Sequence, residues 1–192
     1  MKLWTEKKWK KILFIAIIVF VIVVASVLGF VFFKINNDYV SGIDILNADG
    51  SETAFIIYHP GLSSFMEDVV YALVDGLVEN GWRVEITTAS SQAPTDLSDY
   101  SLLALGSPVY AGNPSPTIKR HLERIGDLNG IDTVLLITLA GSDGGAEASM
   151  QQTVEDHDGT VKEVLSLFNI APNEGDGDPL DIAEQAGREI FP

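Results

Sequence analysis

The chain has 192 residues, a formal net charge of −15 and no cysteine, which excludes disulfide bonds, thiolate metal sites and cysteine nucleophiles. The charge is unevenly distributed. Residues 1–34 carry six lysines and one acidic residue, whereas residues 35–192 carry six basic and 26 acidic residues. The larger part, at about −20, would repel nucleic acid and would favour basic partners.

A segment of 22 residues without a charge runs from Ile12 to Phe33, and only Ser26 and Gly29 interrupt its apolar side chains. At about 1.5 Å per residue it would span about 30 Å, the thickness of the hydrocarbon core of a bilayer. The segment is longer than the apolar region of a cleaved signal peptide, and Ala25-Ser26-Val27 is a poor cleavage site. We therefore expect residues 12–33 to form one uncleaved transmembrane helix that contacts the lipid bilayer.

Lysines precede this segment and acidic residues follow it. Five lysines lie within residues 1–11, whereas Lys34 is followed by Asp38 and Asp44. By the positive-inside rule, residues 1–11 form a basic tail in the cytoplasm. We expect a single-pass protein of the cell membrane whose globular domain lies outside.

The remainder of the chain alternates between two kinds of apolar pattern. Residues 34–52 are polar and predict a linker with a short strand at Ile43–Leu46. Beyond it, short apolar or alternating runs predict strands, and apolar residues spaced by three or four predict helices. The predicted strands are 53–58, 82–87, 101–105, 132–138 and 160–168, and the predicted helices are 64–80, 117–125, 146–157 and 178–190.

This alternation of strands and helices predicts an α/β domain over residues 53–192. Short connections between the elements indicate a parallel sheet covered by helices on both faces. Five strands in about 140 residues suit the doubly wound order 2-1-3-4-5. A helix over 160–168 remains an alternative, because Lys162, Leu165 and Phe168 do not alternate cleanly.

Glycine-containing loops follow the first, third and fourth predicted strands. They read His-Pro-Gly-Leu-Ser-Ser-Phe at 59–65, Gly-Ser-Pro-Val-Tyr-Ala-Gly-Asn-Pro-Ser-Pro at 106–116, and Leu-Ala-Gly-Ser-Asp-Gly-Gly at 139–145. In open α/β sheets, ligands bind at the carboxyl ends of the strands. Over residues 53–192 the chain resembles the flavodoxin family, and the 107–113 loop carries most of the resemblance.

The resemblance implies a flavodoxin-like three-layer sandwich with a five-stranded parallel sheet and FMN as the cofactor. The 107–113 loop would pack against the isoalloxazine ring, with Tyr110 stacked on it, and Leu139-Ala140-Gly141 would form a second ring-side loop with Ser142 and Asp143 behind it. The implied cofactor-binding residues are Gly61, Ser63, Ser64, Ser107, Pro108, Val109, Tyr110, Gly112, Asn113, Leu139, Ala140 and Gly141.

The first loop departs from the family's pattern. Flavodoxins surround the FMN phosphate with a hydroxyl-rich loop of the Ser/Thr-x-Thr-Gly-x-Thr kind. Here Pro60 has no N–H, and Phe65 stands where a threonine is expected. Ser64 and Glu67 also fit a capping box at the start of the first helix. With Asp68, Glu67 would repel a dianion nearby.

The three histidines are far apart in sequence. His59 follows a strand, where it is either a proton donor or phosphate contact, or a loop residue without a role. His121 adjoins Lys119 and Arg120 and is interpreted as part of a solvated face; His157 is interpreted as part of a charged helix end. We expect no catalytic residue and no metal site, and we interpret residues 173–178 as an acidic turn rather than a calcium loop.

These observations lead to three functional hypotheses. The first is a membrane-anchored flavodoxin-like protein that uses FMN for electron transfer, with an acidic surface that lowers the flavin's potential and attracts a basic redox protein. The second is a flavin-dependent reductase of membrane quinone. The third is an interaction module that kept the fold without the flavin.

Overall fold

The computed structural model describes residues 2–141, 144–170, 172–173 and 177–192. The chain divides into two compact units, Met1–Ile35 and Asn36–Pro192, which are described separately. Ser142 and Asp143, expected behind the second ring-side loop, lie outside the described residues. The same holds for residues 174–176 of the predicted acidic turn.

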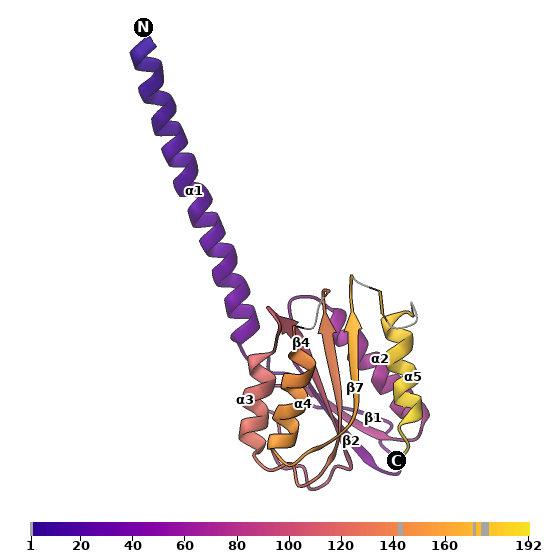
Figure 1. The fold of residues 1–192 in the computed structure, drawn as a ribbon. Coiled ribbons are helices and arrows are strands. Elements are labelled where there is room, and N and C mark those ends of the chain that lie inside the picture. The colour runs from indigo at the N-terminus through magenta and orange to yellow at the C-terminus, as the bar shows by residue number, and fades with distance from the viewer. Residues whose placement is uncertain (1, 142–143, 171, 174–176) are drawn as a thin grey trace. The chain divides into compact units, whose positions relative to one another are not determined.

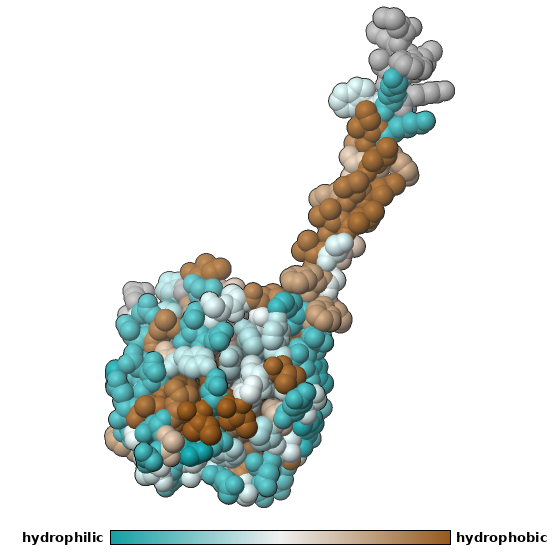
Figure 2. Space-filling model, turned by 180° about the vertical axis from the view of Figure 1, so that it is seen from behind, coloured by the Kyte–Doolittle hydropathy of each residue, from teal (hydrophilic) through white to brown (hydrophobic). Residues whose placement is uncertain are grey.

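The first unit consists of one long helix, α1 (Lys2–Asn36). Its apolar side chains from Ile12 to Phe33 are largely exposed, and Figure 2 shows them as a continuous apolar rod. By length and composition, Lys8–Asn36 is suited to cross a membrane, and none of its most apolar stretch is buried. A helix without a polar face has no means of packing as a surface helix of a soluble domain.

The second unit is built on a sheet whose central strands are all parallel (Figure 1). Five parallel strands lie in the order β3-β2-β4-β6-β7. Counted along the chain, this is the predicted order 2-1-3-4-5, which is confirmed. The strands are β2 (Thr53–Tyr58), β3 (Arg83–Thr88), β4 (Leu102–Tyr110), β6 (Asp132–Leu139) and β7 (Thr160–Phe168).

Two short antiparallel strands bring the sheet to seven strands rather than the predicted five. β1 (Asp44–Leu46) pairs with β3 at the edge, where a short strand was expected, and β5 (Asn113–Pro114) pairs with the end of β4. Residues 36–52, part of the segment 34–52 that the sequence predicts as a linker, belong to the second compact unit.

Helices cover both faces of the sheet, which confirms the three-layer sandwich (Figure 1). α2 (Phe65–Glu79) and α5 (Pro179–Glu189) pack on one face, and α3 (Pro116–Ile125) and α4 (Ala146–Asp156) pack on the other. Each face has its own apolar core, and both cores draw only on the second unit. Residues 36–192 therefore contain both apolar cores of the domain, and we expect them to fold without α1.

β7 is a strand, so the alternative of a helix over residues 160–168 is wrong. Val161 pairs with Thr133 of β6, but the next pair joins Glu163 to Val134 and skips Lys162. Lys162 is therefore the extra residue of a β-bulge, and such a residue shifts the side-chain alternation by one position. The bulge explains why the sequence pattern of this strand is irregular.

β4 is longer than the predicted strand 101–105, and it continues through residues expected to form a loop. Beyond Tyr110, the chain turns back through Ala111 and Gly112 into β5, so that Tyr110 pairs with Asn113. Ala111 and Gly112 have φ values of 50° and 76°. Two successive positive φ values are what a two-residue type I′ hairpin requires.

Ala111 is strained in this turn, because left-handed backbone costs a residue with a side chain about 1–2 kcal/mol. We predict that Ala111→Gly raises the free energy of unfolding of residues 36–192 by about 1 kcal/mol in chemical denaturation. Ala48→Gly is the matched control, since Ala48 is exposed and does not have a positive φ. A loss of stability in Ala111→Gly would show that the turn differs from this description.

Candidate functional site

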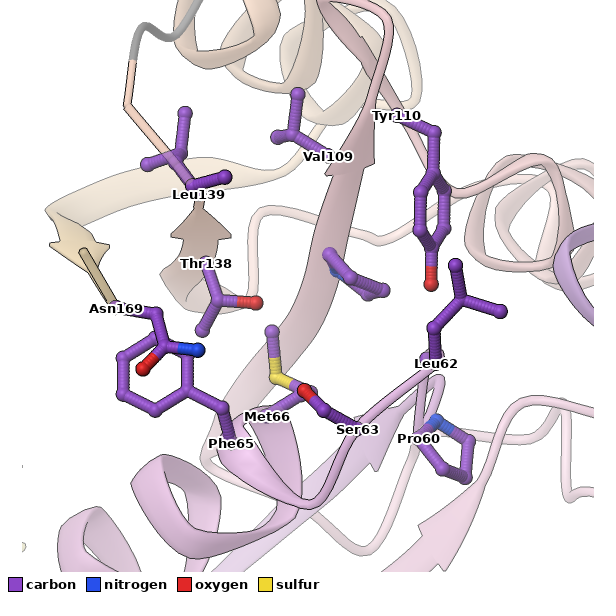
Figure 3. A pocket seen from close by; sticks show the side chains of 13 residues that line it. Pro60, Leu62, Ser63, Phe65, Met66, Val109, Tyr110, Thr138, Leu139 and Asn169 are labelled. Carbon is purple, nitrogen blue, oxygen red and sulfur yellow. The ribbon is translucent and has the colours of Figure 1, made fainter. Parts of the chain in front are cut away.

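A cleft of about 140 Å³ opens at the carboxyl ends of β2, β4 and β6 (Figure 3). The chain leaves β2 for the face covered by α2 and leaves β4 for the face covered by α3, so the cleft lies at a topological switch point. Its lining residues are Pro60, Gly61, Leu62, Ser63, Phe65, Met66, Pro108, Val109, Tyr110, Thr138, Leu139, Ala140 and Asn169.

The structure brings most of the predicted site residues to this cleft. Seven of the twelve line it: Gly61, Ser63, Pro108, Val109, Tyr110, Leu139 and Ala140. The other five, which are Ser64, Ser107, Gly112, Asn113 and Gly141, are not among its lining residues. Sequence reasoning missed Thr138 and Asn169, although both stand at the ends of predicted strands, where a ligand site was expected.

Ser107 and Ser64 use their hydroxyl groups within the protein. Ser107 is fully buried, and its Oγ accepts a hydrogen bond of 2.8 Å from the backbone N–H of Ser115, just before α3. The Ser64 Oγ donates to Asp68 Oδ2 at 3.0 Å and makes no cap bond to the helix backbone. The predicted capping box at the start of α2 is therefore wrong, because the Ser64 hydroxyl donates to the Asp68 carboxylate one turn later.

The loops that follow β4 and β6 touch each other. A Cβ atom placed on Gly144 would lie 2.8 Å from the Gly112 Cα, so the backbones of these two glycines are in direct contact. Both have positive φ values. The side-chain amide of Asn113 donates to the Ala111 carbonyl at 3.1 Å and so supports the turn from within. Gly112 and Asn113 thus shape the edge of the cleft instead of lining it.

The Tyr110 side chain lies between the end of β4 and the loop before α2. Its ring reaches from the end of β4 toward the loop before α2, with the hydroxyl pointing toward Leu62 (Figure 3). A Cβ atom on Gly61 would lie 3.0 Å from this hydroxyl, which explains why the loop carries a glycine there. The hydroxyl is buried beside the Leu62 backbone, and burial raises the pKa of Tyr110 to about 12, since it outweighs the opposing effect of that backbone. The phenol is therefore neutral at physiological pH.

The lining of the cleft is mainly apolar. Leu62, Phe65, Met66 and Val109 contribute hydrocarbon or thioether surface, and no lysine or arginine is among the lining residues. The nearest part of α2 is acidic, since Glu67 and Asp68 lie in its first turn. Among the described residues, no group of His, Cys, Asp and Glu is arranged to hold a metal ion. The arrangement suits a flat, largely uncharged molecule.

His59 does not line the cleft. It is fully buried, its backbone N–H donates to the Gly106 carbonyl at 3.0 Å, and its ring meets that of Tyr39 edge-on at 6.4 Å. His59, the first residue after β2, therefore packs against Tyr39 and does not line the cleft.

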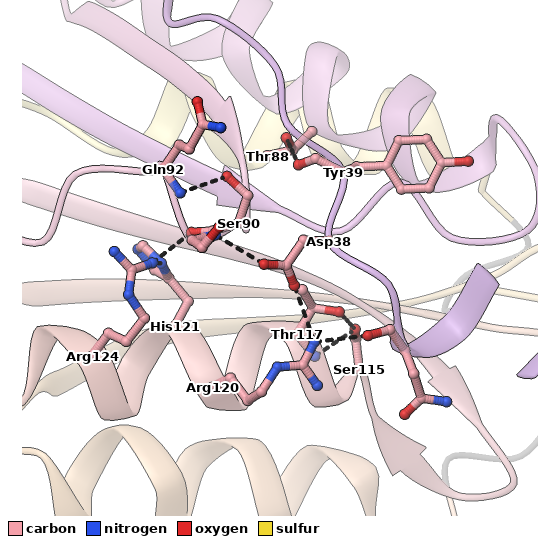
Figure 4. A network of polar contacts seen from close by, with 12 residues as sticks. Asp38, Tyr39, Thr88, Ser90, Gln92, Ser115, Thr117, Arg120, His121 and Arg124 are labelled. Carbon is pink, nitrogen blue, oxygen red and sulfur yellow. Dashed lines mark hydrogen bonds and ion pairs between the residues drawn. The ribbon is translucent and has the colours of Figure 1, made fainter. Parts of the chain in front are cut away.

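A network of polar contacts, separate from the cleft, lies at the carboxyl end of β3 (Figure 4). The carboxylate of Asp38 accepts a hydrogen bond from the Ser91 backbone N–H at 2.9 Å and pairs with Arg120 of α3 at 3.1 Å. The Tyr39 carbonyl accepts a hydrogen bond from the Thr88 hydroxyl. These bonds fix the residues that follow α1 onto the second unit, where the sequence predicted a linker.

His121 is buried in this region, so its interpretation as part of a solvated face is wrong. It is 2% exposed, and its Nδ1 lies 3.2 Å from the Arg124 guanidinium. Burial, and then the positive charge of Arg124, lowers the pKa of His121 to about 4. The sequence held a signal for this, because Ile118, His121, Leu122 and Ile125 fall on one face of a helix.

We predict that His121 makes the domain less stable in mild acid. Its pKa is about 4 in the folded chain and 6.5 ordinarily, so the unfolded chain takes up a proton first as the pH falls. Between pH 7 and pH 5 this lowers the free energy of unfolding by about 2 kcal/mol. Urea denaturation of His121→Gln across this range should show a correspondingly flatter pH dependence. An unchanged slope in the variant would refute the assignment.

Comparison with known proteins supports the fold. No protein-family model matches the chain, and neither does any of the curated proteins. Solved structures do match: a flavodoxin from the domain Archaea has a TM-score of 0.58 at 14% identity and covers 71% of this chain and 94% of its own. The two-electron reduced Megasphaera elsdenii flavodoxin has a TM-score of 0.58 at 17% identity and covers 70% and 98%.

A third similar structure is the NAD(P)H:quinone oxidoreductase from Methanothermobacter marburgensis, with a TM-score of 0.50 at 18% identity and coverage of 71% and 94%. These likenesses, together with the strand order, define residues 36–192 as a flavodoxin-like α/β domain. At such low identity the comparisons establish the fold, and the function has to be argued from the cleft.

Proposed function

We propose that this protein is a membrane-anchored redox protein whose flavodoxin-like domain binds a flavin in the cleft at the ends of β2, β4 and β6. The observation that carries the proposal is that seven residues implied by the flavodoxin resemblance line one cleft at the switch point of the sheet. The flavin would supply the electron-transfer chemistry, and the protein would bind and orient it.

The ring-side half of the cleft fits a flavin. Tyr110 offers an aromatic ring, and Val109 and Leu139 offer apolar contacts on neighbouring strands. Aromatic rings in contact contribute about 0.5–1.5 kcal/mol beyond the area they bury. These residues would contact only the part of FMN that all flavins share, so FMN, the flavin predicted from the sequence, is one member of the class that this half accepts.

The cleft has to widen for a flavin to enter, since about 140 Å³ is well below the roughly 300–1,000 Å³ of most ligand sites. Tyr110 is the side chain best placed to move. Its buried hydroxyl has only the Leu62 backbone beside it and no hydrogen bond of good geometry among the described residues, and an unsatisfied buried group costs about 1–3 kcal/mol. Displacing the ring would give up only the contact with the Leu62 backbone and would bring the hydroxyl into contact with water.

Membrane attachment through α1 is part of the proposal. The lysines before residue 12 favour a cytoplasmic N-terminus and an outward-facing domain. A domain with six basic and 26 acidic residues would attract a basic redox protein and would make the potential of a bound flavin lower. Both effects suit an electron carrier.

The small volume of the cleft also favours a second candidate, an interaction module that has kept the fold and lost the flavin. In that case Tyr110 would close the cleft permanently and the acidic surface would serve partner binding alone. The two candidates differ in one measurable property, which is whether residues 36–192 bind a flavin.

We predict that purified residues 36–192 bind flavin, seen as quenching of flavin fluorescence in a titration with FMN and with riboflavin. Binding without turnover of NAD(P)H and quinone would favour the carrier over a quinone reductase. A domain that quenches neither flavin at saturating concentration would leave only the interaction module.

Variants of Tyr110 test its role directly. Tyr110→Ala should weaken flavin binding about tenfold, the equivalent of about 1.4 kcal/mol of lost stacking. Tyr110→Phe keeps the ring and removes the buried hydroxyl, so its affinity should equal or exceed that of the unmodified domain. Tyr71→Ala is the control, because Tyr71 lies on α2 and does not line the cleft. Equal losses in Tyr110→Phe and Tyr110→Ala would contradict a stacking role.

A further inference from the structure

The β2–α2 end of the cleft lacks the positive charge that a phosphate group needs. The second unit has only six lysine and arginine side chains, all in the described part of the chain, and none of them lines the cleft. Each has a polar partner elsewhere: Arg83 with Glu85, Lys119 with Ser149, Arg120 with Asp38, Arg124 with the Ser90 carbonyl, Lys162 with Asp132, and Arg188 with Glu79 and Glu184.

The start of α2 does not make up for this lack. A helix N-terminus attracts anions through its N–H groups and its dipole, but Glu67 and Asp68 place two carboxylates in the first turn. The Ser64 hydroxyl donates to one of these carboxylates, and Pro60 has no N–H to donate. A dianionic phosphate here would meet a local charge of the same sign as its own.

Neighbouring side chains also cover the loop between β2 and α2. The Tyr110 hydroxyl and the Pro108 side chain lie within 3.0–3.3 Å of a Cβ atom placed on Gly61. The half-exposed Leu62 adds an apolar side chain to the same rim. This end of the cleft therefore presents the Tyr110 hydroxyl and hydrocarbon to a ligand, whereas the Tyr110 ring, Val109 and Leu139 provide the aromatic and apolar surface that a flavin ring needs (Figure 3).

We propose that the cleft selects a flavin without a terminal phosphate, such as riboflavin, over FMN. This inference rests on the proposed flavin-binding function and names the class of flavin that the site takes. Glu67 and Asp68 are the specificity-determining residues: their charges act on the phosphate of FMN and leave the uncharged riboflavin unaffected.

The test is a pair of fluorescence-quenching titrations of residues 36–192, one with riboflavin and one with FMN, at about 0.01 M salt, where screening is weak. We expect riboflavin to bind at least as tightly as FMN. Raising the salt to about 1 M should strengthen FMN binding several-fold and leave riboflavin binding unchanged, because salt screens repulsion. A phosphate held by attraction would give the opposite salt dependence.

The double variant Glu67→Gln/Asp68→Asn should strengthen FMN binding about tenfold without changing riboflavin binding. Asp75→Asn is the control, since it removes one negative charge from the exposed side of α2, about 12 Å from Glu67 along the helix axis. Its FMN affinity should stay within twofold of the unmodified domain.

Two outcomes would overturn the inference, and they can be told apart. FMN binding that is tighter than riboflavin binding at low salt would refute the selection against phosphate and leave the flavin-binding function standing. A domain that binds neither flavin would refute the flavin-binding function, and this inference with it.

Discussion

The position of β4 in the middle of the parallel sheet is the constraint on which the rest of the structure depends. β4 pairs with β2 on one side and β6 on the other, all in the same direction, so the loops that follow these strands meet at one edge. The helices after β2 and β4 lie on opposite faces, which leaves a crevice between the two loops. Any ligand of this domain that uses the strand ends is thereby directed to the cleft beside Tyr110.

The basic side chains of the domain and the apolar cleft lie in different places. Its six basic side chains are all engaged in ion pairs or hydrogen bonds away from the cleft, and three of them, Lys119, Arg120 and Arg124, lie on α3. One of these bonds holds Asp38, two residues after the end of α1, against α3. These three side chains maintain the structure around α3, and the cleft is left to apolar and aromatic contacts.

The sequence predicts the strand order and the ends of most helices, because buried strands and helical stripes depend on local hydrophobic patterns. The extension of β4 to Tyr110 could not be predicted, since it requires a hairpin partner, and a sequence rich in glycine and proline indicates a loop. The sequence pattern left β7 open between strand and helix, because the bulge at Lys162 breaks the alternation of buried and exposed side chains. The Ser64 cap failed for a different reason: its hydroxyl donates to the Asp68 carboxylate and does not accept from a backbone N–H, and the sequence does not decide between these two arrangements.

The central claim is that the three strand-end loops form one flavin site, and residue-resolved NMR of ¹⁵N-labelled residues 36–192 tests it most directly. On titration with riboflavin, the amide signals of Gly61, Tyr110 and Ala140 should shift together. Those of Asn129 and Gly130, which line a separate pocket, should stay in place. Shifts at Asn129 and Gly130 without shifts at the three loop residues would contradict the account.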